Sequence, residues 1–177
     1  TTMVLAALLF VAGLRQFLSR GPGRWQVLAG AGLAYALAQV VAQQAWGLVG
    51  RHMLLNLTLG LIYGALAFES LRARPQQGAA LGPPLLVLAV VMGLLSASTA
   101  ARGFVIAVHG PQAVSQGLYA QIYYAYASLA AVLLGLNLVW MVFVRLNTQL
   151  SELASRDALT RLLTEAGLPV PHPAREY

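Results

Sequence analysis

The feature that most constrains this chain is a series of five apolar stretches separated by short segments rich in arginine, glycine and proline. A helix needs about 20 apolar residues to cross a hydrocarbon core, and most of the stretches approach or exceed that length. With 59% hydrophobic and 9% charged residues, the chain is far more apolar than an ordinary soluble domain. The sequence therefore predicts an all-α fold, a polytopic transmembrane helical bundle surrounded by membrane lipids. The predicted spans are residues 3–18, 25–49, 52–71, 83–101 and the first part of 118–153.

Positive charge lies almost entirely on alternate loops of this predicted bundle. Cytoplasmic loops of membrane proteins carry an excess of arginine and lysine, so the pattern predicts a bacterial inner-membrane protein whose carboxy terminus is cytoplasmic. Thr1 then lies in the periplasm, and we expect an upstream sixth helix in the parent protein. A net charge of +6 distributed in this way indicates topology and not a nucleic-acid partner. The basic loops hold Arg15, Arg20, Arg24, Arg72, Arg74, Arg145, Arg156, Arg161 and Arg175, and the alternate loops hold only Arg51 and Arg102.

The last apolar stretch continues as an amphipathic helix beyond the membrane. Its apolar residues recur at alternating steps of four and three, which is the 3.5-residue repeat of a coiled coil. Leu146, Leu150 and Leu153 keep this repeat although polar residues surround them. We therefore expect a homodimer through this helix, and a lone amphipathic exit helix is the alternative. The predicted seam consists of Leu118, Ile122, Ala125, Leu129, Val132, Leu136, Val139, Phe143, Leu146, Leu150 and Leu153.

A short motif follows the seam. Residues 153–163 read Leu-Ala-Ser-Arg-Asp-Ala-Leu-Thr-Arg-Leu-Leu, and Gly167 comes shortly after. This segment resembles the opening of a GGDEF domain, the catalytic module of bacterial diguanylate cyclases, in which a membrane-proximal helix typically ends in a D-x-L-T turn. That turn would lie at residues 157–160. Arg161 and residues 164–166 depart from the family pattern, which usually has Gly at the first position and Asn with two Arg at the others.

The resemblance implies that the chain is a membrane sensory or anchoring segment of a diguanylate cyclase, whose parent enzyme joins two GTP molecules with the help of Mg. It also implies that Asp157, Leu159 and Thr160 relay a signal from the dimeric stalk. From the residues alone, Asp157 is a candidate cap of a helix over residues 158–163. The catalytic and metal-binding residues of the family do not occur here, so the chain itself is predicted to hold no catalytic residue, metal or cofactor. The predicted domains are a transmembrane bundle at residues 1–146, a cytoplasmic stalk at 147–156 and the start of a GGDEF-like domain with its truncated tail at 157–177.

Polar and aromatic residues gather at the predicted periplasmic ends of the spans. They combine hydrogen-bond donors with aromatic faces, which suits a pocket for a signal molecule. The alternative is interfacial anchoring, in which Trp, Tyr and Arg side chains lie at the level of the lipid headgroups. The candidate pocket residues are Gln43, Gln44, Arg51, His52, Arg102, Tyr119 and Gln121.

A second function is also open. The departures from the family pattern at residues 164–166 are equally typical of a non-catalytic accessory subunit within a larger membrane assembly. A small transporter is disfavoured, because the sequence shows neither an inverted repeat nor an acidic residue at bilayer depth.

Overall fold

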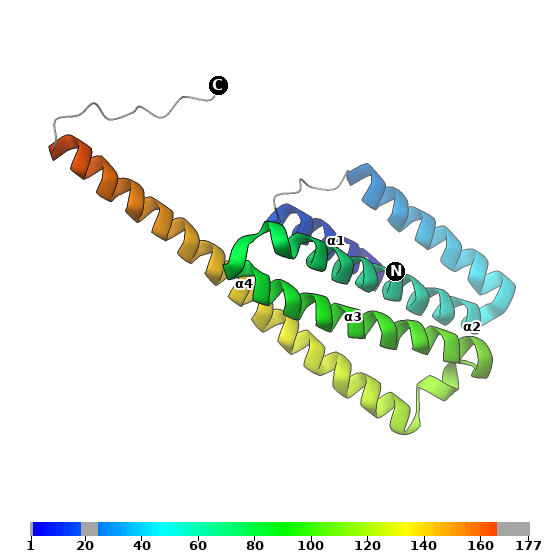
Figure 1. Ribbon diagram of the computed structural model, residues 1–177. Helices are drawn as coiled ribbons and strands as arrows, with labels where there is room; N and C mark the ends of the chain where they lie inside the picture. The colour runs from blue at the N-terminus through cyan, green and yellow to red at the C-terminus, as the bar shows by residue number, and fades with distance from the viewer. Residues whose placement is uncertain (1, 19–24, 166–177) are drawn as a thin grey trace.

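Every element that the structure describes is helical, as the sequence predicts. The computed structural model describes residues 2–18 and 25–165, and the helices lie side by side with one of them projecting beyond the others (Figure 1). The elements in chain order are α1 (Thr2–Phe17), α2 (Trp25–Ala73), the 3-10 turn η1 (Arg74–Gln76), α3 (Gly78–His109), the 3-10 turn η2 (Pro111–Val114) and α4 (Gly117–Glu165).

Helix α2 folds back on itself at a single glycine. Gly47 has φ 59° and ψ −142°, a backbone conformation that only glycine adopts without strain. The residues before and after it form two antiparallel arms, which we call the first arm (residues 25–46) and the second arm (residues 48–73) (Figure 1). Gly50 permits the close approach, because a Cβ atom there would lie 2.7 Å from the Cβ of Trp46.

The second arm packs tightly on α3 through small residues. A Cβ atom added at Gly60 would lie 3.2 Å from the Cβ of Ala100, and the hydroxyl of Ser96 donates a 2.7 Å hydrogen bond to the carbonyl of Gly60. Small residues let helix backbones approach closely in membranes, where apolar burial drives helix association weakly. At the other end of this interface Leu66, Leu85 and Leu88 are fully buried in the main apolar cluster.

Three helices of the described chain are long and apolar enough to cross a membrane. The prediction of five spans exceeds this count for two reasons. The two arms of α2 follow each other with only Gly47 between them and count as one long helix, and α1 has only 16 residues. The three candidate spans are Trp25–Gln76, Gly78–His109 and Gly117–Ser155.

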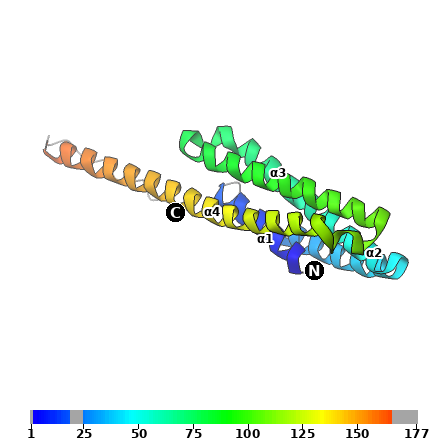
Figure 2. The same cartoon turned by 90° about the horizontal axis from the view of Figure 1, so that it is seen from below.

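The described arginines separate toward the two ends of the bundle. The end of α1, the end of α2 and the start of α3 lie at one end, where the amide of Gln77 donates a hydrogen bond to the carbonyl of Leu18. Helix α4 leaves the bundle at this end and continues as a single rod (Figures 1 and 2). The Gly47 reversal, the end of α3 and the start of α4 lie at the opposite end, with Arg51 and Arg102. Arg20, Arg24 and Arg175 lie outside the described residues.

The prediction of a turn at residues 157–160 is wrong, and so is the prediction that Asp157 caps a new helix. Helix α4 runs without interruption from Gly117 to Glu165. The physical reason is local: five of the six residues at positions 158–163 are Ala, Leu or Arg, which are strong helix formers, and no glycine or proline follows until Gly167.

Substitution of Gly47 tests the reversal in α2. A Cβ atom at Gly47 meets nothing within 4 Å, so the cost of Gly47→Ala arises from its backbone conformation alone. We expect this variant to lose about 1–3 kcal/mol of stability in thermal unfolding in detergent. Gly30→Ala is the matched control, because its Cβ also meets nothing within 4 Å but its backbone is helical, so it should match or exceed the parent stability. Equal melting temperatures for the two variants would contradict the reversal.

Candidate functional site

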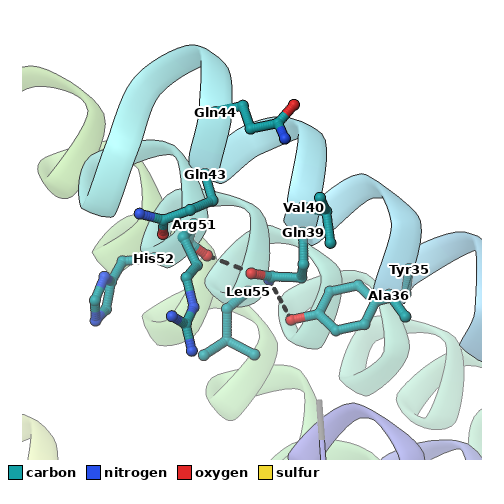
Figure 3. Close-up of a pocket in the computed structure, with 9 residues that line it drawn as sticks. All are labelled: Tyr35, Ala36, Gln39, Val40, Gln43, Gln44, Arg51, His52 and Leu55. Carbon is teal, nitrogen blue, oxygen red and sulfur yellow. Dashed lines mark hydrogen bonds between the residues drawn. The ribbon is translucent and has the colours of Figure 1, made fainter.

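A cleft opens between the two arms of α2 near the Gly47 reversal. Its volume is about 680 Å³, and it combines amide, hydroxyl and guanidinium groups with an apolar wall (Figure 3). The first arm contributes one face of a helix, and the second arm contributes the residues just after the reversal. The lining residues are Tyr35, Ala36, Gln39, Val40, Gln43, Gln44, Arg51, His52 and Leu55.

Gln39 ties the two arms together across this cleft. Its side-chain nitrogen donates hydrogen bonds to the hydroxyl of Tyr35 at 2.5 Å and to the backbone carbonyl of Arg51 at 3.3 Å (Figure 3). Tyr35 is buried, so its ring forms part of the floor of the cleft and its hydroxyl is held by Gln39. The cleft therefore has a fixed polar base at which both arms meet.

The second arm supplies the charged and basic groups. Arg51, His52 and Leu55 project from the second arm, and all three line the cleft (Figure 3). The Nδ1 atom of His52 lies 2.8 Å from the carbonyl of Leu48. A carbonyl only accepts hydrogen bonds, so Nδ1 carries the proton and Nε2 is the ring nitrogen available to a ligand.

Four of the seven predicted pocket residues thus lie together, and three lie elsewhere. Arg102 belongs to a cluster between α3 and α4: its guanidinium carbon lies 4.4 Å from the ring centre of Tyr123 and 5.1 Å from that of Tyr124. It also donates a 3.0 Å hydrogen bond to the Tyr124 hydroxyl. Tyr119 lines a separate, mainly apolar cleft of about 370 Å³ between the same helices. Gln121 is exposed and lines neither cleft.

Sequence reasoning did not select Tyr35 and Gln39. A sequence pattern could have indicated them, because residues 35, 39 and 43 recur at steps of four and so share one face of a helix. The sequence does not reveal that the chain reverses at Gly47 and brings that face against Arg51.

The predicted seam on α4 lies on the face that points away from the bundle. Ala130, Asn137 and Met141 are buried on the opposite face, where the Asn137 amide donates a 3.1 Å hydrogen bond to the carbonyl of Pro84 in α3. Among the seam residues, Leu118, Ile122, Leu129, Val132, Leu136, Val139, Phe143, Leu146, Leu150 and Leu153 are all more than half exposed. Asp157, Leu159 and Thr160 lie within the helical backbone of α4, and their side chains are outside what the structure describes.

One arginine fixes α4 where it leaves the bundle. The guanidinium of Arg145 donates a hydrogen bond to the carbonyl of Phe17, the last residue of α1, and lies 5.0 Å from the ring centre of the same residue. Nearer the start of α4, the hydroxyl of Tyr126 donates a hydrogen bond to the carbonyl of Val91 in α3. Helix α4 is thus held along one side by a small number of polar contacts to α1 and α3.

The comparisons with known proteins do not add a family to these observations. No family model, no curated protein and no solved structure matches this chain. Across the described residues, no group of three or more histidine, aspartate or glutamate side chains lies close enough together to hold a metal ion. The geometry therefore defines a membrane helical bundle with a polar cleft at one end and a projecting helix at the other.

Proposed function

We propose that this chain is the membrane-embedded sensory or anchoring segment of a bacterial diguanylate cyclase, and that it relays a signal through a dimeric rod. The observation that carries the proposal is the single, unbroken helix α4, which joins the bundle to the D-A-L-T segment and exposes an apolar seam along its outer face. The GTP and Mg of the parent enzyme would bind to a catalytic domain attached to this rod.

The proposed topology has five crossings of the bacterial inner membrane. Each arm of α2 exceeds the roughly 20 residues that a span needs, and their antiparallel arrangement lets each arm cross separately. Helices α3 and α4 provide two further crossings, and the proposal assigns the fifth to α1, whose 16 residues are fewer than a full span needs. The end that holds Arg15, Arg72, Arg74 and Arg145 faces the cytoplasm in this proposal, and Thr1 and the Gly47 reversal face the periplasm.

Dimer formation follows from how α4 is presented. A cyclic dinucleotide needs two GTP-loaded domains that face each other, so the distance and rotation between two rods would control output. The seam on α4 is available for such pairing because the bundle covers only the opposite face. Of the most apolar part of this helix, 17% is buried within the chain, so lipids or a second copy must cover the remainder.

The same exposed face favours a second candidate function. A helix that lies at the edge of a bundle with most of its surface uncovered can also bind the subunits of a larger membrane assembly. In that case the chain would be a non-catalytic accessory subunit, and α4 would contact foreign helices in place of a second copy.

Reporter fusions test the proposed topology. Alkaline phosphatase is active only outside the cytoplasm, so we expect activity from a fusion after Gly110 and none from a fusion after Glu165. β-Galactosidase fused at the same positions should give the reciprocal pattern. Phosphatase activity from the Glu165 fusion would place the rod in the periplasm and overturn the signalling proposal.

Cysteine crosslinking tests the dimer. The chain has no native cysteine, so a single substitution gives an unambiguous signal. Leu146→Cys and Leu150→Cys should form disulfide-linked dimers in oxidised native membranes, because seam residues of paired helices lie within disulfide distance. Thr148→Cys is the control, because it lies on the opposite side of the same turns. Equal crosslinking at all three positions, or crosslinking to another protein only, would contradict the homodimer.

Changing the phase of the rod tests the relay. We would fuse the chain after Leu163 to a catalytically competent GGDEF domain and measure cyclic di-GMP in cells. Insertion of seven residues after Leu153 preserves the heptad phase and should retain output, whereas insertion of two residues rotates the attached domains by about 200° and should lower output about tenfold. Equal output from the two insertions would show that the rod acts only as a tether.

A further inference from the structure

The cleft between the arms of α2 holds one positive charge that the chain does not neutralise. Arg51 is the only charged residue among those that line it. The described hydrogen bonds include one to the Arg51 backbone carbonyl, and within the described residues the guanidinium forms neither an ion pair nor a contact with an aromatic ring. Arg102 at the same end differs, because two tyrosine rings and a hydroxyl surround it.

Among the side chains that the structure describes, no carboxylate forms an ion pair with Arg51. The first acidic residue, Glu69, lies near the far end of the second arm, and the other acidic residues follow from residue 152 onward in and beyond the rod. A guanidinium has five donors in a planar fork that matches an oxyanion, and charge-assisted hydrogen bonds of this kind are about twice as strong as neutral ones. Within the described part of the chain, the end of the bundle that holds the cleft therefore carries no competing carboxylate.

The rest of the cleft adds a polar rim and an apolar wall. The amides of Gln43 and Gln44 supply further donors for an oxyanion. Ala36, Val40 and Leu55 supply the apolar surface. A cleft of about 680 Å³ suits a ligand of small-molecule size.

We infer that this cleft binds a monoanionic oxyanion attached to an apolar body, with the Arg51 guanidinium holding the anion and the wall formed by Ala36, Val40 and Leu55 holding the body. A small organic acid and the phosphodiester of an anionic lipid share this chemistry. The inference names the class of signal for the proposed sensory function, but binding itself does not depend on a catalytic domain.

Direct binding tests the inference. The full chain, purified without lipid in a neutral detergent, would be titrated with benzoate and with benzamide, which has the same shape and no charge. Binding would be followed by fluorescence of the native tryptophans, of which Trp46 lies one residue before the Gly47 reversal. We expect benzoate to bind about tenfold more tightly than benzamide, because only benzoate pairs with the guanidinium.

Two arginine variants distinguish specific binding by Arg51 from non-specific attraction by the positive charge at this end of the bundle. Arg51→Gln should weaken benzoate binding about tenfold, and Arg102→Gln, which removes the same charge at the same end, should leave it within about twofold. Arg51→Lys keeps the charge but loses the planar fork and should give an intermediate affinity. Size-exclusion elution and melting temperature establish that each variant is folded.

A second set of measurements identifies the source of the anion. In nanodiscs of phosphatidylcholine, benzoate should bind as it does in detergent. Phosphatidylglycerol is then added to the nanodiscs. If it competes with benzoate in the parent but not in Arg51→Gln, the site belongs to lipid headgroups, and if it does not compete, the site belongs to a soluble acid. Equal binding of benzoate and benzamide, or equal loss in Arg51→Gln and Arg102→Gln, would overturn the inference. Because these are binding measurements, they can succeed when the cyclic di-GMP experiment fails, and the reverse.

Discussion

A backbone amide in hydrocarbon finds no water, so each one must be satisfied within the protein, and this constraint governs how the chain can turn back at the membrane. Helix α2 meets it with the smallest possible interruption, a single residue at Gly47 in a conformation open only to glycine. Gly50 then allows the arms to come together without displacing Trp46. This short reversal also creates the cleft, because it places the residues just after Gly47 opposite one helical face of the first arm.

In the proposed sensory function, packed helices connect the cleft to the rod. The second arm carries Arg51 on the side that faces the cleft and Gly60 on the side that contacts α3. Gly60 and Ala100 lie so close together that the second arm and α3 are tightly packed. Helix α3 in turn contacts α4 through the carbonyls of Val91 and Pro84. A ligand shifts such a system only if it binds one packing of the arms better than another.

Much of this architecture could be predicted from residue pattern alone. The length of the apolar stretches predicted the all-helical class, and the arginines predicted which helix ends lie together. The alternating steps of four and three predicted an apolar stripe on α4, whose residues are exposed in the structure. The reversal at Gly47 is a backbone property that hydropathy does not encode. The sequence therefore did not predict that Tyr35 and Gln39 line the same cleft as Arg51. The predicted turn at residues 157–160 is absent, because the strong helix propensity of this segment outweighs the break that the family motif typically has.

The geometry of the seam suggests how a rod of this kind could have two states. A straight helix drifts by about 20° per heptad against a 3.5-residue repeat, so over the five heptads from Leu118 to Leu153 the seam rotates by about 100°. Two straight copies of α4 can therefore pair at one end of the seam or at the other, but not along all of it. Pairing along its full length requires a left-handed supercoil, which would bend α4 on both sides of the point where Arg145 is hydrogen-bonded to Phe17. A change in bundle packing that favours one end over the other would then rotate whatever the rod carries.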